Sequence, residues 1–425
     1  MASLAVLISL VACAALASGA TGVRIELTRV HSSPFVRDAV RRDMHRHSAR
    51  RLAASGDTVS APVIEGPSSL GEYLMTLAIG TPPLSYPAIA DTGSDLIWTQ
   101  CAPCGDDQCF QQSTPLYNPA NSTTFSYLPC SSQLSICEAA SLPACVCPGY
   151  NYTYGTGWTS GVQGSETFSF GSSPADETSV SDIVFGCSNA SSSDFNGSSG
   201  LVGLGRGSLS LVSQLGAGTF SYCLTALQDS NSTSTLLLGS SASLNDTGVG
   251  TTPFVPSPDM APFNTFYYLN LTGISLGTTA LSIPVDVFTL AANGTGGLII
   301  DSGTTITSLV DAAYQQIRAA VLSMVTLPTT DGSDATGLDL CFALPSSKSA
   351  PPAMPSMTLH FDGADMVLPA GSYMTQDSNL WCLALQNQTY GMPSILGNYQ
   401  QQNMHILYDI GQETMSFAPA DCSTF

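Results

Sequence analysis

Beyond residue 60 the chain has very few basic residues. Twenty-seven aspartates and glutamates stand there against three basic side chains, Arg206, Arg318 and Lys348. A surface this acidic repels nucleic acid and acidic membranes, so neither is expected as a partner. Most of these carboxylates have no cation to pair with, and their mutual repulsion weakens as they protonate. The composition therefore favours a protein that works in acid.

Histidine is also scarce in this part of the chain, where only His360 and His405 remain. Neither flanks a G-x-S-x-G sequence, which is absent, and HExxH is absent as well. A serine or cysteine hydrolase needs a histidine partner, and a metal hydrolase needs a cluster of histidines or carboxylates. Both classes are therefore disfavoured, and neither a metal nor a cofactor is expected.

Long apolar runs are missing, apart from residues 4–17. This run ends in small residues and predicts a secretory signal peptide over residues 1–20. No other run approaches the ~20 residues that a membrane span needs, so no membrane anchor is expected. The expected location is the extracellular space, with the vacuole as the alternative.

The rest of the chain has the pattern of an all-β protein. From residue 70 onward, short apolar or alternating runs are punctuated by Gly, Pro, Ser and Asn. One helix is predicted over residues 311–325, with Asp311 as its N-cap and an apolar face made of Ile317, Ala320, Val321 and Met324. Four prolines in 250–262 mark a boundary between an N-terminal lobe, 67–255, and a C-terminal lobe, 256–425.

One unusual turn occurs twice. Asp91 follows an apolar run in AIADTGSDLIW at 88–98, and Asp301 does so in LIIDSGTTITSL at 298–309. A single Asp-Thr-Gly turn is most often a turn capped by its own aspartate. Here each copy is followed at similar spacing by an apolar-apolar-glycine element, at 201–203 and 395–397, which indicates two related lobes.

Further motifs give the chain a resemblance to the pepsin-like aspartic proteases over nearly its whole length. These motifs are DTGS at 91–94, YGTG at 154–157, GLVGLGRG at 200–207, DSGTT at 301–305 and ILGN at 395–398. The cysteine-rich stretch after Trp98 and QQQNMHILYD at 400–409 resemble the nepenthesin-like plant branch in particular. The resemblance implies a two-lobed pepsin-like fold with the active site in the cleft between the lobes. It also implies a monomeric aspartic endopeptidase that acts on proteins or peptides.

The resemblance also assigns roles to individual residues. Asp91 and Asp301 are the implied catalytic pair. The implied supporting residues are Thr92, Gly93, Ser94, Ser302, Gly303 and Thr304; the inner hydroxyls brace the two turns and the outer ones bond the carboxylates. The implied flap that closes over substrate consists of Tyr154, Gly155, Thr156 and Gly157. Trp98 is the implied partner of the flap tyrosine.

Two facing carboxylates can activate water without a covalent intermediate. They cannot both ionise cheaply, so they share a proton across a wide pH range. The ionised one then takes a proton from a bound water while the protonated one donates to the scissile carbonyl. The sequence leaves open which of Asp91 and Asp301 carries the proton first.

Twelve cysteines remain once Cys13 leaves with the signal peptide. An even number in a secreted chain predicts six disulfides, with Cys341 paired to Cys382 because these are the only cysteines between Cys223 and Cys422. The cysteine-rich insertion, residues 101–149, is too rich in turns for a core of its own. Its pairing stays open, and its spacing also allows a metal site, which an oxidising compartment disfavours.

Residues 21–66 hold eight of the eleven basic residues. Such a run is often only a solvated tail. In pepsin-like zymogens a basic segment covers the acidic cleft, so the resemblance implies a removable pro-segment. Nine Asn-x-Ser/Thr sequences suit a secreted glycoprotein.

One rival function belongs to a different class. Relatives on the same fold act as non-catalytic binding proteins or inhibitors, typically with a damaged catalytic turn or flap. Here Asp91, Asp301 and the hydroxyls beside them are all present, which favours the protease.

Overall fold

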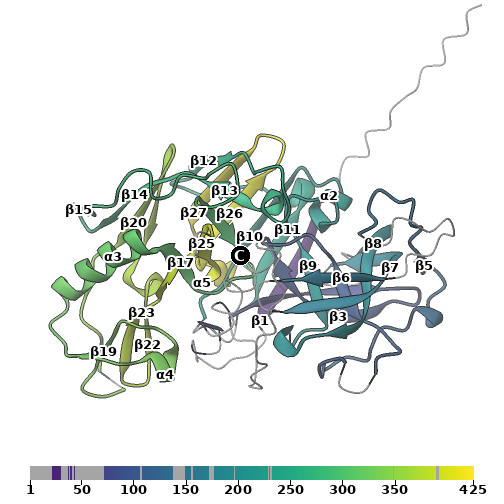
Figure 1. Cartoon of the computed structure of the whole chain (residues 1–425), viewed down its shortest axis with the longest axis horizontal. Helices are drawn as coiled ribbons and strands as arrows, with labels where there is room; N and C mark the ends of the chain where they lie inside the picture. Colours follow the sequence, from purple (N-terminus) through teal and green to yellow (C-terminus); the bar gives the residue numbers. More distant parts are fainter. Residues whose placement is uncertain are drawn as a thin grey trace, which may run out of the picture.

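The computed structural model describes residues 22–29, 37, 39–40 and 43, and residues 71–425 apart from 106–107, 137–148, 155–156, 172–176, 196, 228, 230–231, 348 and 389–391. The predicted signal peptide and most of the predicted pro-segment lie outside these residues. The described chain consists mostly of β-strands arranged in two lobes (Figure 1). This confirms the predicted all-β, two-lobed fold.

The strands fall into three sheets, one of nineteen strands and two of four. The strands up to residue 255 are β1 (Val23–Arg29), β2 (Tyr73–Ile79), β3 (Leu84–Asp91), β4 (Trp98–Gln100), β5 (Ser126–Tyr127), β6 (Tyr150–Thr153), β7 (Trp158–Phe170), β8 (Thr178–Ser191), β9 (Gly200–Gly203), β10 (Thr219–Cys223), β11 (Ser234–Leu238) and β12 (Gly250–Val255). The later strands are β13 (Tyr267–Leu269), β14 (Leu271–Leu276), β15 (Thr279–Ala280), β16 (Leu298–Asp301), β17 (Thr307–Val310), β18 (Thr329–Thr330), β19 (Cys341–Ala343), β20 (Met357–Phe361), β21 (Ala364–Leu368), β22 (Met374–Asp377), β23 (Leu380–Leu383), β24 (Leu385–Gln388), β25 (Ser394–Gly397), β26 (Met404–Asp409) and β27 (Thr414–Pro419).

The described helices are few and mostly short. They are α2 (Leu211–Gln214), α3 (Asp311–Met324), α4 (Ser333–Thr336) and α5 (Asn398–Gln401), with single 3-10 turns η1 (Pro119–Asn121), η2 (Ser193–Phe195), η3 (Gly239–Ser241), η4 (Phe263–Thr265), η5 (Ala370–Ser372) and η6 (Cys422–Thr424). None of the helices in the described part of the chain is long and apolar enough to cross a membrane.

Helix α3 corrects two details of the sequence analysis. Its N-cap is Val310, because β17 runs straight into the helix and leaves Asp311 as the first helical residue. The Asp311 carboxylate instead accepts a bond from Asn387 Nδ2 at 2.7 Å and suits the positive end of the helix dipole. Ile317 and Val321 are buried as predicted, but Met324 is 42% exposed, and Val325, the residue after the helix, is buried instead.

The largest sheet joins the two halves of the chain. Strand β10 pairs antiparallel with β26, and β12 pairs with β27, so strands from both predicted lobes share one sheet in the middle of the molecule (Figure 1). The lobe limits of 67–255 and 256–425 remain predictions. Strand β1 adds to this sheet from within the predicted pro-segment, between β11 and β2. Its Val23, Ile25 and Leu27 are buried, whereas Arg24 and Glu26 face outward.

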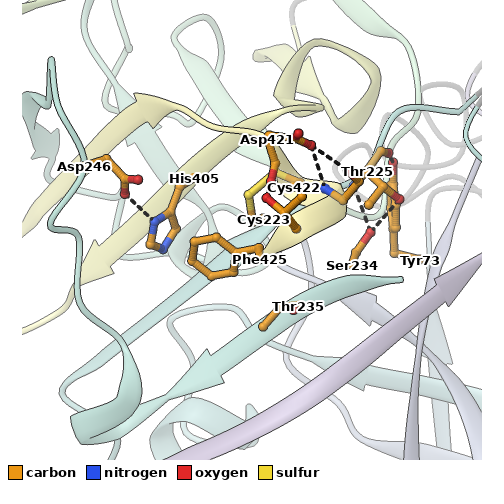
Figure 2. Close-up of a disulfide and its surroundings, with 12 residues drawn as sticks. Tyr73, Cys223, Thr225, Ser234, Thr235, Asp246, His405, Asp421, Cys422 and Phe425 are labelled. Atoms are coloured by element: carbon orange, nitrogen blue, oxygen red, sulfur yellow. Dashed lines mark hydrogen bonds and ion pairs between the residues drawn. A yellow bond between two sulfur atoms is a disulfide. The ribbon is translucent and has the colours of Figure 1, made fainter. Parts of the chain in front are cut away.

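The C-terminus is fastened to the same sheet (Figure 2). A disulfide joins Cys223 of β10 to Cys422, and the ring of Phe425 packs 4.4 Å from the ring of His405. His405 Nδ1 in turn lies 2.8 Å from Asp246 Oδ2. Arg24 of β1 donates to the carbonyl oxygen of Phe425 at 2.7 Å.

Three further disulfides occur among the described residues. Cys341 pairs with Cys382, as predicted, and Cys101 pairs with Cys187, which ties the insertion at 101–149 to β8. The other pair is Cys104–Cys109. Cys130 is unpaired, contrary to the expectation of six disulfides. The other three cysteines of the insertion lie in 137–148, outside the described residues.

Candidate active site

Two equivalent strands deliver Asp91 and Asp301 to the middle of the molecule. Asp91 is the last residue of β3 and pairs in parallel with Gly203 of β9. Asp301 is the last residue of β16 and pairs in parallel with Gly397 of β25. Each glycine strand is also paired antiparallel with the strand that follows the turn, β4 in one case and β17 in the other. The repeat seen in the sequence is thus a repeat of architecture.

The two carboxylates have matching hydrogen bonds. Asp91 Oδ1 accepts from the backbone N–H of Gly93 at 2.9 Å, and its Oδ2 accepts from Ser94 Oγ at 2.5 Å. Asp301 repeats this pattern with Gly303 N at 2.8 Å and Thr304 Oγ1 at 2.7 Å. Both acids are at most 1% exposed. Bonds of this kind stabilise a buried carboxylate that would otherwise be costly.

The inner hydroxyls brace one turn against the other. The backbone N–H of Thr92 donates to Ser302 Oγ at 3.0 Å, and the backbone N–H of Ser302 donates to Thr92 Oγ1 at 2.9 Å. Ser302 Oγ then donates to the carbonyl of Ala90 at 2.9 Å. These reciprocal bonds fix the distance between the two acid-bearing turns.

The glycine after the first acid allows the turns to approach closely. A Cβ atom added at Gly93 would lie 2.6 Å from Asp301 Oδ2 and 2.7 Å from its Cγ. The carboxylate of Asp301 therefore lies directly against the peptide whose N–H holds Asp91. Any side chain at Gly93 would occupy the space between the two turns.

Tyr154 lies in an aromatic cluster beside the first turn. Its ring centroid is 6.5 Å from that of Trp98 and 5.3 Å from that of Phe195, which packs edge-on against both. Tyr154 is 6% exposed, and burial raises the pKa of its hydroxyl well above the usual range, with a further contribution from Asp91. Its backbone N–H donates to Gly157 O at 2.7 Å and closes the hairpin turn. Gly155 and Thr156 lie outside the described residues.

Two protein-family models match the chain, the xylanase inhibitor N-terminal model over residues 73–240 and the xylanase inhibitor C-terminal model over residues 266–419. Aspartic proteinase nepenthesin-1 from Nepenthes gracilis is 48% identical over 375 residues, covering 85% of this chain and 82% of the relative. Nepenthesin-2 from the same plant is 42% identical, covering 94% of this chain and 90% of the relative. The chain belongs to the nepenthesin-like aspartic proteases.

Solved structures agree on the fold of this nepenthesin-like protease. The structures of edgp and of basic 7S globulin from soybean align with TM-scores of 0.68 and 0.66. They cover 96% and 95% of this chain, and 96% and 98% of their own chains, at 16% and 18% sequence identity. At this identity the likeness shows the fold alone. The relatives named as aspartic proteinases show the reaction class, so the protein is an aspartic endopeptidase.

A second constellation of catalytic residue types lies elsewhere on the nepenthesin-like fold. His360 Nε2 is 2.7 Å from Ser275 Oγ, and His360 Nδ1 is 2.7 Å from Asp365 Oδ1. The side chain of Asp365 is 61% exposed, whereas an aspartate that orients a catalytic histidine is buried. The three residues come from adjacent strands, β14, β20 and β21, so they form a cross-strand bond network.

Metal chemistry has no support among the described residues of this protease. Their His, Cys, Asp and Glu side chains form no group of three or more that could hold a metal ion. The cysteines at 101, 104 and 109, whose spacing allowed a metal site, are all in disulfides.

Several residues near the turn that bears Asp301 were not singled out from the sequence. Asn398 Nδ2 donates to the carbonyl of Ser302 at 2.9 Å, and Gln401 Nε2 donates to the carbonyl of Asp301 at 3.3 Å. Asp43, from the predicted pro-segment, accepts from the backbone N–H groups of Thr305 and Ile306. The available signal was polarity in an apolar setting, since Asn398 and the three glutamines at 400–402 follow closely on the buried strand β25.

Asp95, one residue beyond the DTGS motif at 91–94, links that motif to the second half of the chain. Its Oδ1 accepts from Gly207 N at 2.8 Å and from Thr265 Oγ1. A Cβ at Gly207 would lie 2.1 Å from Asp95 Oδ2, so the carboxylate is enclosed although the residue as a whole is partly exposed. Burial raises the pKa of Asp95, and the bonds from Thr265 and Gly207 oppose that rise.

The raised pKa of Asp95 predicts greater stability in acid. The folded protein binds this proton more tightly than the unfolded chain, so the contribution is present in acid and is lost as the pH rises through the folded pKa. Asp95→Asn should reduce the fall in melting temperature between acid and neutral pH, because the amide has no proton to lose. Calorimetry across pH checks this; equal falls in both proteins would contradict it.

Proposed function

We propose that this aspartic endopeptidase is secreted, is made as a zymogen, and cleaves peptide bonds at acid pH with a water activated between Asp91 and Asp301. The observation that carries the proposal is the pair of equivalent turns, whose carboxylates have matching hydrogen bonds and meet across Gly93. The substrates are proteins or peptides, and the enzyme is proposed to act as a monomer without a cofactor.

Each step of the reaction follows from one shared proton. The ionised carboxylate removes a proton from water, whose oxygen bonds to the scissile carbonyl carbon while the protonated carboxyl gives its proton to the carbonyl oxygen. The tetrahedral intermediate then breaks its C–N bond, and a proton passes to the leaving amine. Ser94 and Thr304, which donate to the outer carboxylate oxygens, keep the inner oxygens directed toward the water.

The flap completes the site by excluding water. Tyr154 directly follows β6, and its ring packs against Trp98 and Phe195. Closing a hairpin over bound substrate strengthens the interactions within the site. The aromatic cluster therefore supplies a rigid wall on the side of Asp91, and substrate binds beneath the flap.

Support for a zymogen comes from the contacts of the predicted pro-segment. Val40 is fully buried and packs with Ile306 and Tyr399 beside the second catalytic turn. Asp43, also fully buried, accepts from Thr305 N at 3.0 Å and from Ile306 N at 2.7 Å. Of the arginines at 37–51 that were expected to cover the cleft, only Arg37 lies among the described residues. Among the described residues of the pro-segment, the polar contact with the second turn is thus made by the aspartate Asp43.

An acidic contact gives a direct route to activation in acid. Backbone N–H groups bond a carboxylate more strongly than a neutral carboxyl, so protonation of Asp43 weakens the attachment of the pro-segment. Asp43→Asn should therefore be processed faster than wild type, and at a higher pH. Glu26→Gln is the matched control, because it neutralises an exposed carboxylate of the same segment.

The measurement for Asp43 is N-terminal sequencing and gel analysis of full-length protein held at a series of pH values. Identical processing of Asp43→Asn and wild type would mean that this contact does not control release. Faster processing of Glu26→Gln as well would assign the effect to the charge of the segment in general.

The proposal of secretion rests on the disulfides and on the exposed Asn-x-Ser/Thr sequences (sequons). Four disulfides among the described residues require an oxidising compartment. The sequon asparagines at 121, 151, 189, 245, 270 and 293 are exposed, as glycan carriers must be. The extracellular space is the proposed destination, with the vacuole as the alternative.

A binding protein on the same fold is the second candidate, because the matching family models are described as xylanase inhibitor domains. Incubating acid-treated protein with denatured haemoglobin separates the two functions. The proposal expects cleavage in acid that is blocked by pepstatin, whose hydroxyl mimics the tetrahedral intermediate. No cleavage, together with tight binding to another enzyme, would favour the second candidate.

A further inference from the structure

A run of three glutamines, Gln400 to Gln402, lies buried directly beyond the catalytic glycine strand β25. Gln401, the last residue of α5, is fully buried and uses both ends of its carboxamide. Its Nε2 donates to the carbonyls of Leu396 at 2.8 Å and Asp301 at 3.3 Å. Its Oε1 accepts from the hydroxyl of Tyr222 at 2.5 Å. One side chain thus joins the backbone of a catalytic aspartate to a strand from the other half of the chain.

The network continues toward the first catalytic turn. The hydroxyls of Tyr222 and Tyr408 lie 2.8 Å apart, in the shared sheet formed by β10 and β26. The ring of Tyr408 packs 4.8 Å from the ring of Tyr267, whose hydroxyl donates to the carbonyl of Leu204 at 2.9 Å. The backbone N–H of Leu204 in turn donates to the carbonyl of Asp91 at 2.8 Å. Tyr222, Tyr408 and Tyr267 thus connect Gln401 to the first turn.

The two turns differ in how the carbonyl of the aspartate is held. The carbonyl of Asp91 accepts from the backbone N–H of Leu204 at 2.8 Å, and that of Ser94 accepts from Gly205 N at 2.9 Å. In the second turn, the backbone N–H of Asn398 goes to the carbonyl of Thr304 at 2.7 Å, and Gln401 reaches Asp301 with its side chain. The carbonyl of Asp301 thus accepts from a side chain, whereas the carbonyl of Asp91 accepts from a backbone N–H group.

We propose that Gln401 is a positioning residue for the catalytic pair, which fixes the second turn relative to the first through Tyr222. This inference rests on the proposed roles of Asp91 and Asp301. A buried network whose members are all satisfied is rigid, and the loss of one member leaves the others unsatisfied. Without Gln401 the Asp301 turn gains freedom to move away from the Asp91 turn.

A change in that separation has a specific kinetic signature. Two acids that share a proton titrate at two apparent pKa values, and closer coupling moves these values further apart. Looser turns weaken the coupling, so the acid limb of the pH profile moves up and the alkaline limb moves down. Substrate binding depends on the cleft and flap and should change little. The expected signature is a lower kcat in a narrower pH profile, with KM nearly constant.

The test compares Gln401→Met with Gln400→Met in the mature enzyme. Gln400 is the neighbouring glutamine, equally buried, and also has three hydrogen bonds, to Ser372 O, Ala384 O and Thr307 N. Gln401→Met should lower kcat by about 10- to 100-fold, the loss typical of a misplaced catalytic group. Gln400→Met should lose similar stability and keep the wild-type pH profile.

Two further variants keep the test decisive if Gln401→Met does not fold. Tyr222→Phe removes only the hydroxyl and should also narrow the pH profile of kcat. Its control is Tyr73→Phe, which removes an equally buried hydroxyl bonded to Thr225 O at 2.6 Å (Figure 2). Tyr73→Phe should keep the wild-type pH profile. Gln401→Glu, neutral in acid, keeps an acceptor and one donor and should recover most of kcat at the acid optimum.

The possible outcomes separate this inference from the proposed function. An active wild type with unchanged kcat and pH profile in Gln401→Met or Tyr222→Phe overturns the positioning role alone. Equal losses of kcat in Gln400→Met and Gln401→Met also overturn it, because the effect would then be general destabilisation. A folded wild type without peptidase activity overturns the proposed function and the positioning role together.

Discussion

Asp301→Asn and Asp91→Asn should each lower peptide hydrolysis by roughly 10³-fold or more, since proton transfer by a positioned carboxyl contributes ~10²–10⁴-fold. The asparagine oxygen still accepts from Gly303 N or Gly93 N, so the turns remain folded. An amide cannot share a proton with the remaining carboxylate. The loss should therefore extend over the whole pH range rather than shift the optimum.

The assay uses a fluorogenic peptide and acid-matured protein, with melting temperature measured in parallel. Asp286→Asn, which changes an exposed aspartate in the same way, is the control and should retain full activity. Because each dyad variant also blocks self-processing, each is matured by adding a trace of wild-type enzyme that is then removed. Substantial activity in either dyad variant would falsify the assignment of the pair.

Gly93→Ala is expected to have the second largest effect. The added Cβ would lie 2.6 Å from Asp301 Oδ2, closer than any real contact, and that carboxylate is held by Gly303 N and Thr304 Oγ1. The clash has to be relieved by moving the second turn, which should cost about 10²-fold in kcat.

The control for Gly93→Ala is Gly218→Ala, where a Cβ meets nothing within 4 Å. Steady-state kinetics on both variants, with circular dichroism to confirm folding, completes the comparison. Wild-type kcat in Gly93→Ala would show that the two turns are further apart than the structure places them.

The sequence predicted the acid pair because its evidence is local and repeated. Asp91 and Asp301 each end an apolar run and precede a glycine, and a strand end followed by a tight turn requires that pattern. Parallel pairing of these strands with Gly203 and Gly397 then follows from the second repeated element. The pairing of Cys341 with Cys382 was predictable for a similar reason, because no other cysteine lies near them in the chain.

Contacts between distant segments were less accessible to the sequence. The hold of the arginines at 37–51 on the pro-segment stays a prediction, and the sequence did not predict the described contact of Asp43 with the second turn. Strand β1 was not predicted, because its partner β11 lies more than two hundred residues away. The sequence did not predict a role for Gln401 for the same reason, since only the fold brings its side chain to Tyr222.

Local geometry also limited the prediction of α3. Aspartate is a favoured N-cap residue, which is why Asp311 was predicted as the N-cap. The strand before the helix ends at Val310, however, and Val310 is the N-cap. Met324 fits the helical period of Ile317 and Val321, yet it is exposed, and Val325, the capping residue after it, packs into the core. Periodicity identified the helix and its buried centre, and tertiary packing decided its ends.

The most direct test of the central claim is the rate of peptide hydrolysis by the mature wild-type enzyme as a function of pH. If Asp91 and Asp301 share one proton, kcat/KM should peak in acid, fall toward neutral pH as the second proton leaves, and fall again in strong acid when both groups are protonated. A rate that rises through neutral pH, or that does not fall in strong acid while the protein stays folded, would contradict a mechanism based on this pair.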